Sequence, residues 1–161
     1  MKLLYLCTHN ACRSILCEVI TRDLAGGQIE AASAGSHPAG KVHPQTLIHL
    51  ENRGYPTANL RSKGFAEVAD FAPDALITVC DQAAQEPCPV WLSSAVNAHW
   101  GLPDPTRFST SAATMQPTFE AVTTTIEGRI QRLMTEMSPS MSPEQLTNLL
   151  NRIGEEHHGA V

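Results

Sequence analysis

The sequence predicts one α/β domain: a doubly wound, mostly parallel sheet of four strands, flanked by helices and followed by an extra C-terminal helix. Three observations support this fold class. Short apolar runs alternate along the chain with segments of helical periodicity. The 161 residues, 42% of them hydrophobic, fit one core and leave little room for a second. Two of the apolar runs end in a cysteine, and folds of this class bind ligands at the carboxyl ends of their strands.

The first half of the chain predicts two strands and two helices. Apolar residues 3–6 form a short run typical of a buried strand, and helical periodicity begins at Arg13. Residues 29–34 follow a pair of glycines and predict the second strand. Pro44 is a good first helical residue, and the helix that it opens should stop at Gly54.

The second half continues the alternation. Residues 74–80 predict the most convincing buried strand, because their centre is continuously apolar. Residues 81–86 look helical, with Asp81 as a plausible N-cap, and residues 95–99 predict a weaker strand. Helical periodicity returns over residues 112–137. A last short helix should begin at Ser142, which is followed by proline and, three residues on, by glutamine.

Composition excludes several function classes. The net charge of −5 argues against a general nucleic-acid binder, and aromatic residues, at 5%, give no support for base stacking. No stretch approaches the roughly 20 apolar residues of a membrane span, and the N-terminus lacks a secretory signal. Five cysteines, an odd number without an export signal, predict reduced thiols in a cytoplasmic protein.

The sharpest motif runs from Cys7 to Ser14 and reads C-x5-R-S between the first strand and the first helix. Such a loop can wrap its N–H groups around a tetrahedral oxyanion, with the helix N-terminus behind it. The same field should lower the pKa of Cys7 and make it a nucleophile, while Ser14 donates a hydrogen bond to the thiolate. The expected oxyanion contacts are Thr8, His9, Asn10, Ala11, Cys12 and Arg13.

The residues with reactive side chains also have non-catalytic interpretations when each is considered alone. The spacing C-x5-R also arises by chance, and only its position between a strand and a helix favours an oxyanion loop. Asp104 with Pro105 is a common turn pair, and Cys80 would usually be a small buried apolar residue. Cys88 differs, because a proline on each side keeps it out of a helix and near the surface.

The C-x5-R-S motif and four further segments resemble one known superfamily. The four segments are Ser-Ala-Gly at residues 33–35, Thr-Val-Cys-Asp at 78–81, Glu-Pro-Cys-Pro-Val at 86–90 and His-Trp-Gly-Leu-Pro-Asp-Pro at 99–105. Together they resemble the low-molecular-weight protein tyrosine phosphatases, and within them the branch of arsenate reductases. The resemblance covers about residues 2–137. It implies a catalytic domain over residues 1–137 and a helical extension over 138–161, to which no role is assigned.

The resemblance implies a role for each reactive residue. Cys7 attacks arsenate in the loop, and Asp104 is the general acid that protonates the departing oxygen. Cys80 attacks Cys7 and expels arsenite, and Cys88 then takes over Cys80. Arg13 binds the oxyanion in the loop, and Ser14 stabilises the Cys7 thiolate. Thioredoxin, or glutaredoxin with glutathione, would reduce the final disulfide. Phosphate or sulfate could occupy the loop in place of arsenate, and the reaction needs no cofactor.

The sequence predicts no metal site. Asn10, Glu18 and Ser33 match residues that surround a potassium ion in some relatives, but Lys63 stands where those relatives carry a carboxylate. Its ammonium could replace the cation by pairing with Glu18. His9 stands where relatives often have glycine. Cys12 and Cys17 lack zinc-ligand spacing and are interpreted as packing residues, and the histidines at 157 and 158 as a solvated tail.

Two other functions stay open. One is a phosphatase for phosphotyrosine or small phosphate esters, which needs Cys7, Arg13 and Asp104 but neither Cys80 nor Cys88, with Cys12 guarding the nucleophile. The other is an oxyanion-binding or redox-sensing regulatory domain.

The relay that the resemblance implies would require a change of structure between Cys80 and Cys88. Eight helical residues would rise about 12 Å, whereas a disulfide needs Cα atoms within about 7 Å. We therefore expect oxidation to unwind residues 81–86.

Overall fold

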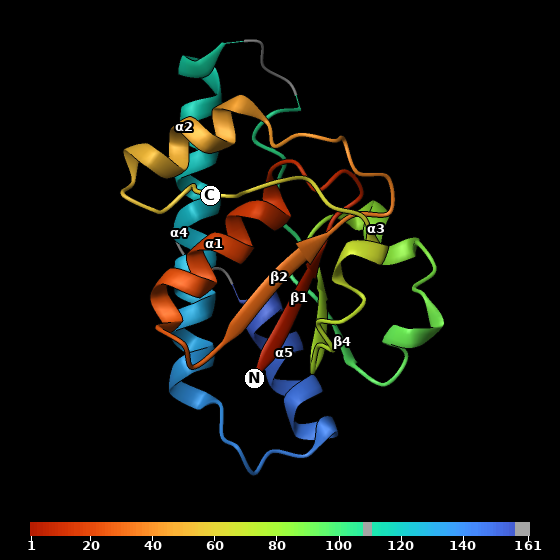
Figure 1. Ribbon diagram of the computed structural model, residues 1–161. Helices are drawn as coiled ribbons and strands as arrows, with labels where there is room; N and C mark the ends of the chain where they lie inside the picture. Colours follow the sequence, from red (N-terminus) through yellow and green to blue (C-terminus); the bar gives the residue numbers. More distant parts are fainter. Residues whose placement is uncertain (108–110, 157–161) are drawn as a thin grey trace.

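The computed structural model describes residues 1–107 and 111–156, and within them four strands form one parallel sheet (Figure 1). The strands are β1 (Lys2–Leu6), β2 (Glu30–Ala34), β3 (Ala75–Thr78) and β4 (Val96–His99), and they lie in the order β2-β1-β3-β4. Each neighbouring pair is parallel. The predicted fold class is confirmed, and the carboxyl ends of all four strands meet at one edge.

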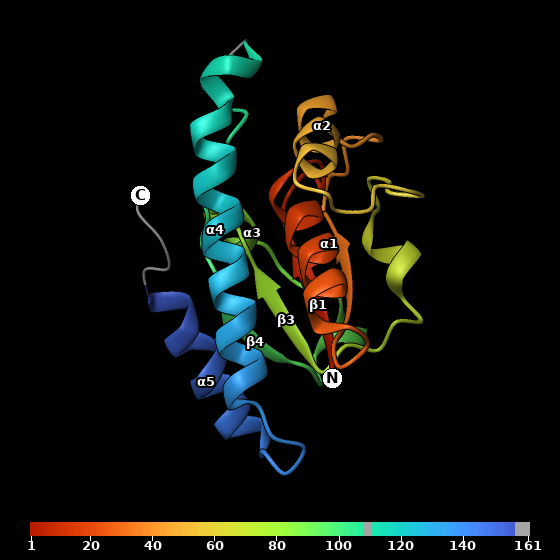
Figure 2. The same ribbon diagram turned by 90° about the vertical axis from the view of Figure 1, so that its left-hand side faces the viewer.

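Helices connect and cover the strands. They are α1 (Arg13–Ala25), α2 (Pro44–Asn52), α3 (Asp81–Gln85), α4 (Ala112–Glu136) and α5 (Pro143–Glu155), with short 3-10 turns η1 (Phe65–Val68) and η2 (Val90–Leu92). Figure 2 shows α1 and α4 side by side on one face of the sheet, and these two helices contact each other. On the opposite side the cover is made of short turns and loops, which include η1 and η2 (Figure 1).

Alternation along each strand divides the interior into two cores. In β1, Leu3 and Tyr5 point into the larger core, whose other walls are α1, α4 and α5. Leu4 and Leu6 point into a smaller core on the other face, which Val68 of η1 helps to close. A strand that is buried on both faces is apolar throughout, which explains the unbroken apolar run in the sequence.

The structure corrects three local predictions. The strand predicted at residues 74–80 is shorter, because its ladder ends at Thr78 and the chain leaves the sheet with Cys80 at its exit. The N-cap of α3 is Cys80 and not Asp81, since the Cys80 sulfur accepts the N–H of Ala83 at 3.4 Å. Neither 3-10 turn was predicted, because three or four residues carry too little periodicity to be recognised.

The C-terminal helix α5 begins where the sequence predicts. Ser142 Oγ accepts the N–H of Gln145, the Gln145 side chain accepts the N–H of Ser142, and Pro143 follows the cap. The helix buries Leu149, Leu150 and Ile153 in the larger core and contacts β4 and α4. Among the residues that the structure describes, none of the helices is both long and apolar enough to cross a membrane.

Candidate active site

The loop between β1 and α1 is held with its carbonyl oxygens turned outward. Thr8 O accepts the N–H of His37, and His9 O accepts the N–H of Ala39 and the hydroxyl of Ser62. Ala11 O accepts the N–H of His43 and the hydroxyl of Thr46. Because a trans peptide sets each C=O opposite the following N–H, the N–H groups of residues 9, 10 and 12 face into the loop. An inward ring of N–H groups is what an oxyanion requires.

Two residues make this loop shape feasible. Asn10 has a φ of 47°, a left-handed conformation that asparagine tolerates better than most residues, whereas His9 is not in that region. The side chain of Asn10 donates to Ser14 Oγ at 2.8 Å and to Ser33 Oγ at 2.9 Å, which fixes the turn. Gly35 passes so close behind it that a Cβ there would lie 2.5 Å from the carbonyl oxygen of Thr8. This explains the glycine of the Ser-Ala-Gly motif.

The structure brings Cys7 and Cys80 together, although 72 residues separate them in the chain. Both sit at the carboxyl ends of neighbouring strands, both are buried, and each side chain shifts the pKa of the other. The Thr8 hydroxyl lies 3.7 Å from the Cys80 sulfur. The spatial pairing expected from strand order is confirmed.

The pKa of Cys7 is raised, contrary to the sequence-based expectation that the loop lowers it. The hydrogen bond to Cys80 and burial raise the pKa of Cys7 above its usual value, although the Arg13 charge opposes them. The pKa of Cys80 is lowered to about 5, first by the hydrogen bond from Cys7, then by the N–H of Ala83 and the groups of Thr8. Of the two thiols, Cys80 at the N-cap of α3 is therefore the more acidic.

Arg13 and Asp104 face each other across the pocket. Arg13 is the first residue of α1, and its Nη1 donates to Leu102 O at 3.2 Å, while its Nη2 lies 3.6 Å from Asp104 Oδ2. The other carboxylate oxygen of Asp104 accepts the N–H and the hydroxyl of Thr106. One carboxylate oxygen thus anchors the turn, and the other is directed toward the site.

Cys88 is the one predicted reactive residue that lies outside this cluster. It is exposed and follows α3, between Pro87 and Pro89. The segment is nevertheless tied to the loop, because the Thr8 hydroxyl donates to Glu86 Oε1 at 3.2 Å. Sequence reasoning assigned Thr8 only an oxyanion contact and Glu86 none. The available signal was a carboxylate two residues before Cys88.

The ammonium of Lys63 lies beside Glu18, behind the oxyanion loop. Its Nζ lies 3.6 Å from Glu18 Oε1, donates to Ser33 Oγ at 3.4 Å and donates to Arg61 O at 3.0 Å. Its backbone N–H also donates to Asn10 Oδ1 at 2.8 Å. The expected pairing of Lys63 with Glu18 is confirmed. Among residues 1–107 and 111–156, no group of three or more His, Cys, Asp and Glu residues is arranged to hold a metal ion.

The remaining residues singled out by sequence fall into three groups. Cys12 and Cys17 are buried, and burial raises the pKa of each thiol to about 12, as suits packing residues. Trp100 is fully buried and donates its indole N–H to Leu150 O, so it has no face to offer a substrate ring. The histidines at 157 and 158 lie outside the described residues.

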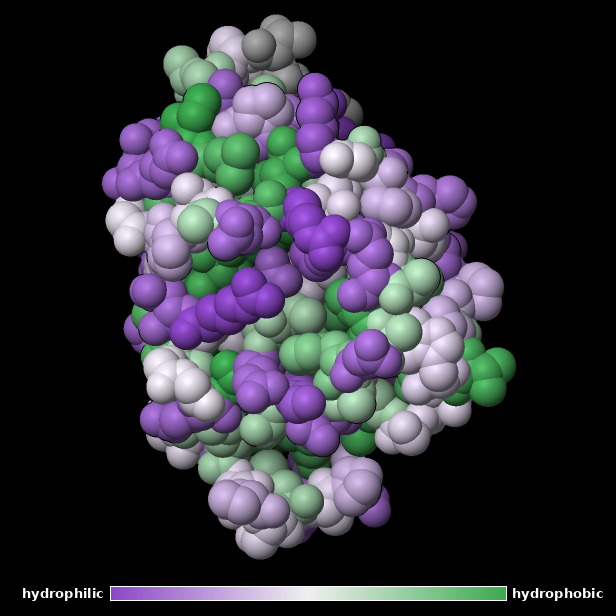
Figure 3. All heavy atoms as spheres, viewed as in Figure 1, coloured by the Kyte–Doolittle hydropathy of each residue, from purple (hydrophilic) through white to green (hydrophobic). Residues whose placement is uncertain are grey.

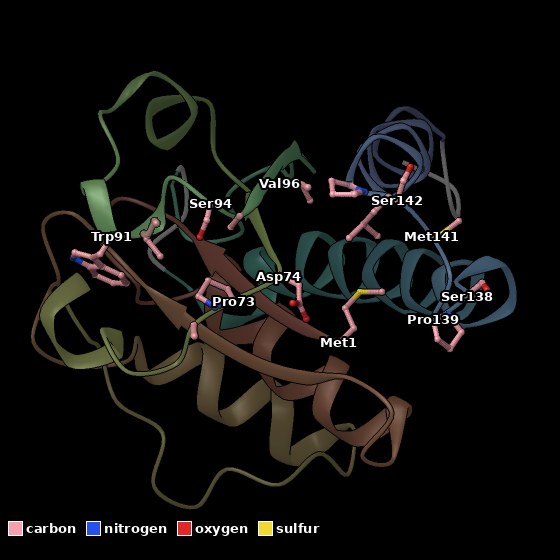
Figure 4. A pocket seen from close by; sticks show the side chains of 15 residues that line it. Met1, Pro73, Asp74, Trp91, Ser94, Val96, Ser138, Pro139, Met141 and Ser142 are labelled. Atoms are coloured by element: carbon pink, nitrogen blue, oxygen red, sulfur yellow. The ribbon is translucent and has the colours of Figure 1, made fainter.

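The site opens into a pocket of about 560 Å³. Its described lining consists of Thr8, His9, Arg13, Cys80, Asp81, Gln82, Leu102, Pro103, Asp104 and Arg107. A second cavity of about 640 Å³ lies at the opposite end of the strands, between Met1, Trp91 and the start of α5 (Figure 4). Its described lining contains no cysteine and no basic residue. Of these two cavities, the first is the one whose described lining includes residues of the oxyanion loop.

The fold and the loop define the class: an α/β protein with a cysteine-bearing oxyanion loop after its first strand. The chain belongs to the low molecular weight phosphotyrosine protein phosphatase family, whose signature matches residues 2–142. It is 25% identical over 137 residues to the glutaredoxin arsenate reductase of a Synechocystis species, a match that covers 85% of this chain and 98% of that protein.

The chain is also similar to two solved structures of arsenate reductases. A structure described as an arsenate reductase in the phosphate binding state superposes with a TM-score of 0.69 at 25% identity, covering 85% of this chain and 98% of that one. The thioredoxin-dependent arsenate reductase of Corynebacterium glutamicum gives a TM-score of 0.62 at 28% identity, covering 83% of this chain and 60% of that one.

Proposed function

We propose that the protein is an arsenate reductase that works through a thiol relay of Cys7, Cys80 and Cys88. The observation that carries the proposal is the placement of two buried thiols, Cys7 and Cys80, at the carboxyl ends of the neighbouring strands β1 and β3. A phosphatase needs one thiol there, and a second one beside the nucleophile suits a reaction in which sulfur attacks sulfur. The relatives named arsenate reductase support the same conclusion.

The first step is the attack of Cys7 on arsenic. The inward N–H groups and Arg13 hold the oxyanion, and the Cys7 proton passes to Cys80 as the nucleophile forms. A sulfur–arsenic bond forms, an arsenic–oxygen bond breaks, and Asp104 protonates the departing oxygen, which leaves as water. Ser14 Oγ already accepts a hydrogen bond from Asn10, so its own proton is available to stabilise the Cys7 thiolate.

The second step reduces arsenic. Cys80 gives up the proton that it took from Cys7 to the departing arsenite, and its thiolate attacks the Cys7 sulfur. The sulfur–arsenic bond breaks, and its electron pair stays on arsenic, which leaves as arsenite. The two thiols have then supplied two electrons and form a Cys7–Cys80 disulfide. Cys88 attacks the Cys80 sulfur, which releases Cys7 and leaves a Cys80–Cys88 disulfide. An external dithiol or glutathione system returns the two electrons.

A phosphatase is the second candidate, because the family is defined by that activity and Cys7, Arg13 and Asp104 would serve both reactions. The described lining of the pocket offers no Phe, Tyr or Trp to stack on a phosphotyrosine ring. Small phosphate monoesters are therefore the substrates to compare with arsenate.

Parallel assays separate the two candidates. The purified protein is given arsenate with a thioredoxin system or with a glutaredoxin and glutathione system, and separately para-nitrophenyl phosphate. We expect sustained arsenate turnover with one of the donor systems and its loss in Cys80→Ser. Hydrolysis of the phosphate ester without arsenate turnover, unchanged in Cys80→Ser, would favour the phosphatase.

A further inference from the structure

Arg129, in the middle of α4, is a buried guanidinium with no carboxylate partner among the described residues. Its side chain is 6% exposed, its Nε has no hydrogen-bond partner there, and burial lowers its pKa. Both of its hydrogen bonds go to backbone carbonyls: Nη1 donates to Gly101 O at 3.4 Å and Nη2 to Gly154 O at 3.2 Å. A buried charge without an opposite charge is costly, so stability alone does not account for it.

Gly101 belongs to the turn that carries Asp104. Backbone bonds from Trp100 N to Thr78 O and from Leu102 N to Val79 O tie the start of this turn to the end of β3. The next two carbonyls are both held by arginines, since Gly101 O accepts from Arg129 and Leu102 O accepts from Arg13. Arg13 lines the pocket, whereas Arg129 reaches the turn from α4. The turn is therefore fixed between the oxyanion loop and the helical layer.

The helix α5 supplies the other half of the Arg129 contact. Gly154 lies so close to the end of β4 that a Cβ there would be 2.4 Å from His99 O and 2.6 Å from the Trp100 ring. The Trp100 indole donates to Leu150 O at 2.8 Å, and the Arg129 guanidinium lies 5.9 Å from that ring. Figure 2 shows α5 alongside the lower half of α4. The C-terminal helix and the acid-bearing turn are thus joined through Arg129 and Trp100.

We propose that Arg129 is a positioning residue for the Asp104 turn, and that α5 holds Arg129 in the orientation that this requires. The proposal rests on the proposed role of Asp104 as general acid. It gives the C-terminal extension a part in catalysis at a site that none of its own residues enters. Displacing the turn should slow proton delivery to the departing oxygen while leaving the oxyanion loop intact, because a misplaced catalytic group loses rate without losing ligand contacts.

A double-mutant cycle tests the proposal. Arg129→Met is made alone and together with Asp104→Asn, and the single-turnover rate of arsenite release is measured beside the affinity for inorganic phosphate. In the otherwise native protein we expect the rate to fall by about tenfold or more with phosphate affinity within about twofold of native. In the Asp104→Asn background the same change should alter the rate by less than about twofold, because residues acting through one group are not additive.

Two further variants keep the test decisive. Gly154→Ala keeps the arginine but forces α5 away from β4, and with it the carbonyl oxygen to which Arg129 Nη2 donates. It should show the same dependence on Asp104 if Arg129→Met fails to fold. Gln131→Met is the matched control, because Gln131 lies on α4 two positions from Arg129 and is exposed. It should leave the rate within about twofold of native.

Equal losses in both backgrounds, or a parallel loss of phosphate affinity, would overturn the proposal and leave the relay untouched. If Asp104→Asn alone leaves the rate unchanged, the acid assignment fails, and the role of Arg129 fails with it.

Discussion

The ammonium of Lys63 lies 3.6 Å from the carboxylate of Glu18, and the two side chains are 11% and 2% exposed. Both stand directly behind the oxyanion loop, where Lys63 also contacts Ser33 and, through its backbone, Asn10. Arg22 is the second cation on the same carboxylate, at 3.3 Å. A cation supplied by the chain therefore supports the loop.

Replacing Lys63 with methionine should destabilise the protein and loosen the loop. Breaking a buried ion pair usually lowers the free energy of unfolding by about 3–5 kcal/mol, because one charge loses its partner. We expect the lower end of this range, about 3 kcal/mol, because Arg22 still contacts Glu18. Denaturant unfolding measures this, and Arg61→Met, which removes an exposed ion pair nearby, is the control. A change below about 0.5 kcal/mol would show that Lys63 does not support the loop.

Asp104→Asn should lower turnover by about 100- to 10,000-fold, because the amide keeps the size of the carboxyl but has no proton to give. Phosphate should bind as well as before or more tightly, since a negative charge 3.6 Å from Arg13 has been removed. Calorimetric titration with phosphate beside a single-turnover assay provides both numbers. If affinity dropped as steeply as turnover, Asp104 would be a structural residue.

The lowered pKa of Cys80 predicts how the stability of the protein depends on pH. The folded pKa, about 5, lies below the ordinary value of 9.0, so the unfolded chain binds more protons between these values. This contribution to stability is full above pH 9 and is lost as the pH falls through 5. The native protein should therefore gain stability over Cys80→Ser as the pH rises from 5 to 8. Parallel unfolding profiles of the two proteins would contradict the lowered pKa of Cys80.

Oxidation should unwind α3. Cys80 is buried at its N-cap and Cys88 is exposed beyond its end. A disulfide needs Cα atoms within about 7 Å, whereas the helical rise over Asp81–Gln85, continued by the extended Glu86, carries the chain away from Cys80. Amide hydrogen exchange over residues 81–89 should be faster in the oxidised protein, because the N–H groups of a loop are less protected. Equal protection in both states, with the Cys80–Cys88 bond confirmed by mass, would show that no unwinding is needed.

The sequence predicts the sheet and the loop well because both depend on local patterns. The apolar run before Cys7, the Arg13 helix start and the cap at Ser142 are each visible within a few residues. The raised pKa of Cys7 could not be predicted, since it depends on Cys80, 73 positions away in the chain. Arg129 was missed for the same reason, because nothing near it in sequence distinguishes it from a surface arginine on an amphipathic helix.

The most direct test of the relay is a single turnover with arsenate and no added reductant, followed by mapping of the disulfides by mass spectrometry. The account predicts one arsenite per native chain together with a Cys80–Cys88 bond. Cys88→Ser should release one arsenite and trap Cys7–Cys80, and Cys7→Ser should release none. Arsenite release by Cys7→Ser at the native rate, or release by the native protein without a new disulfide among these cysteines, would contradict it.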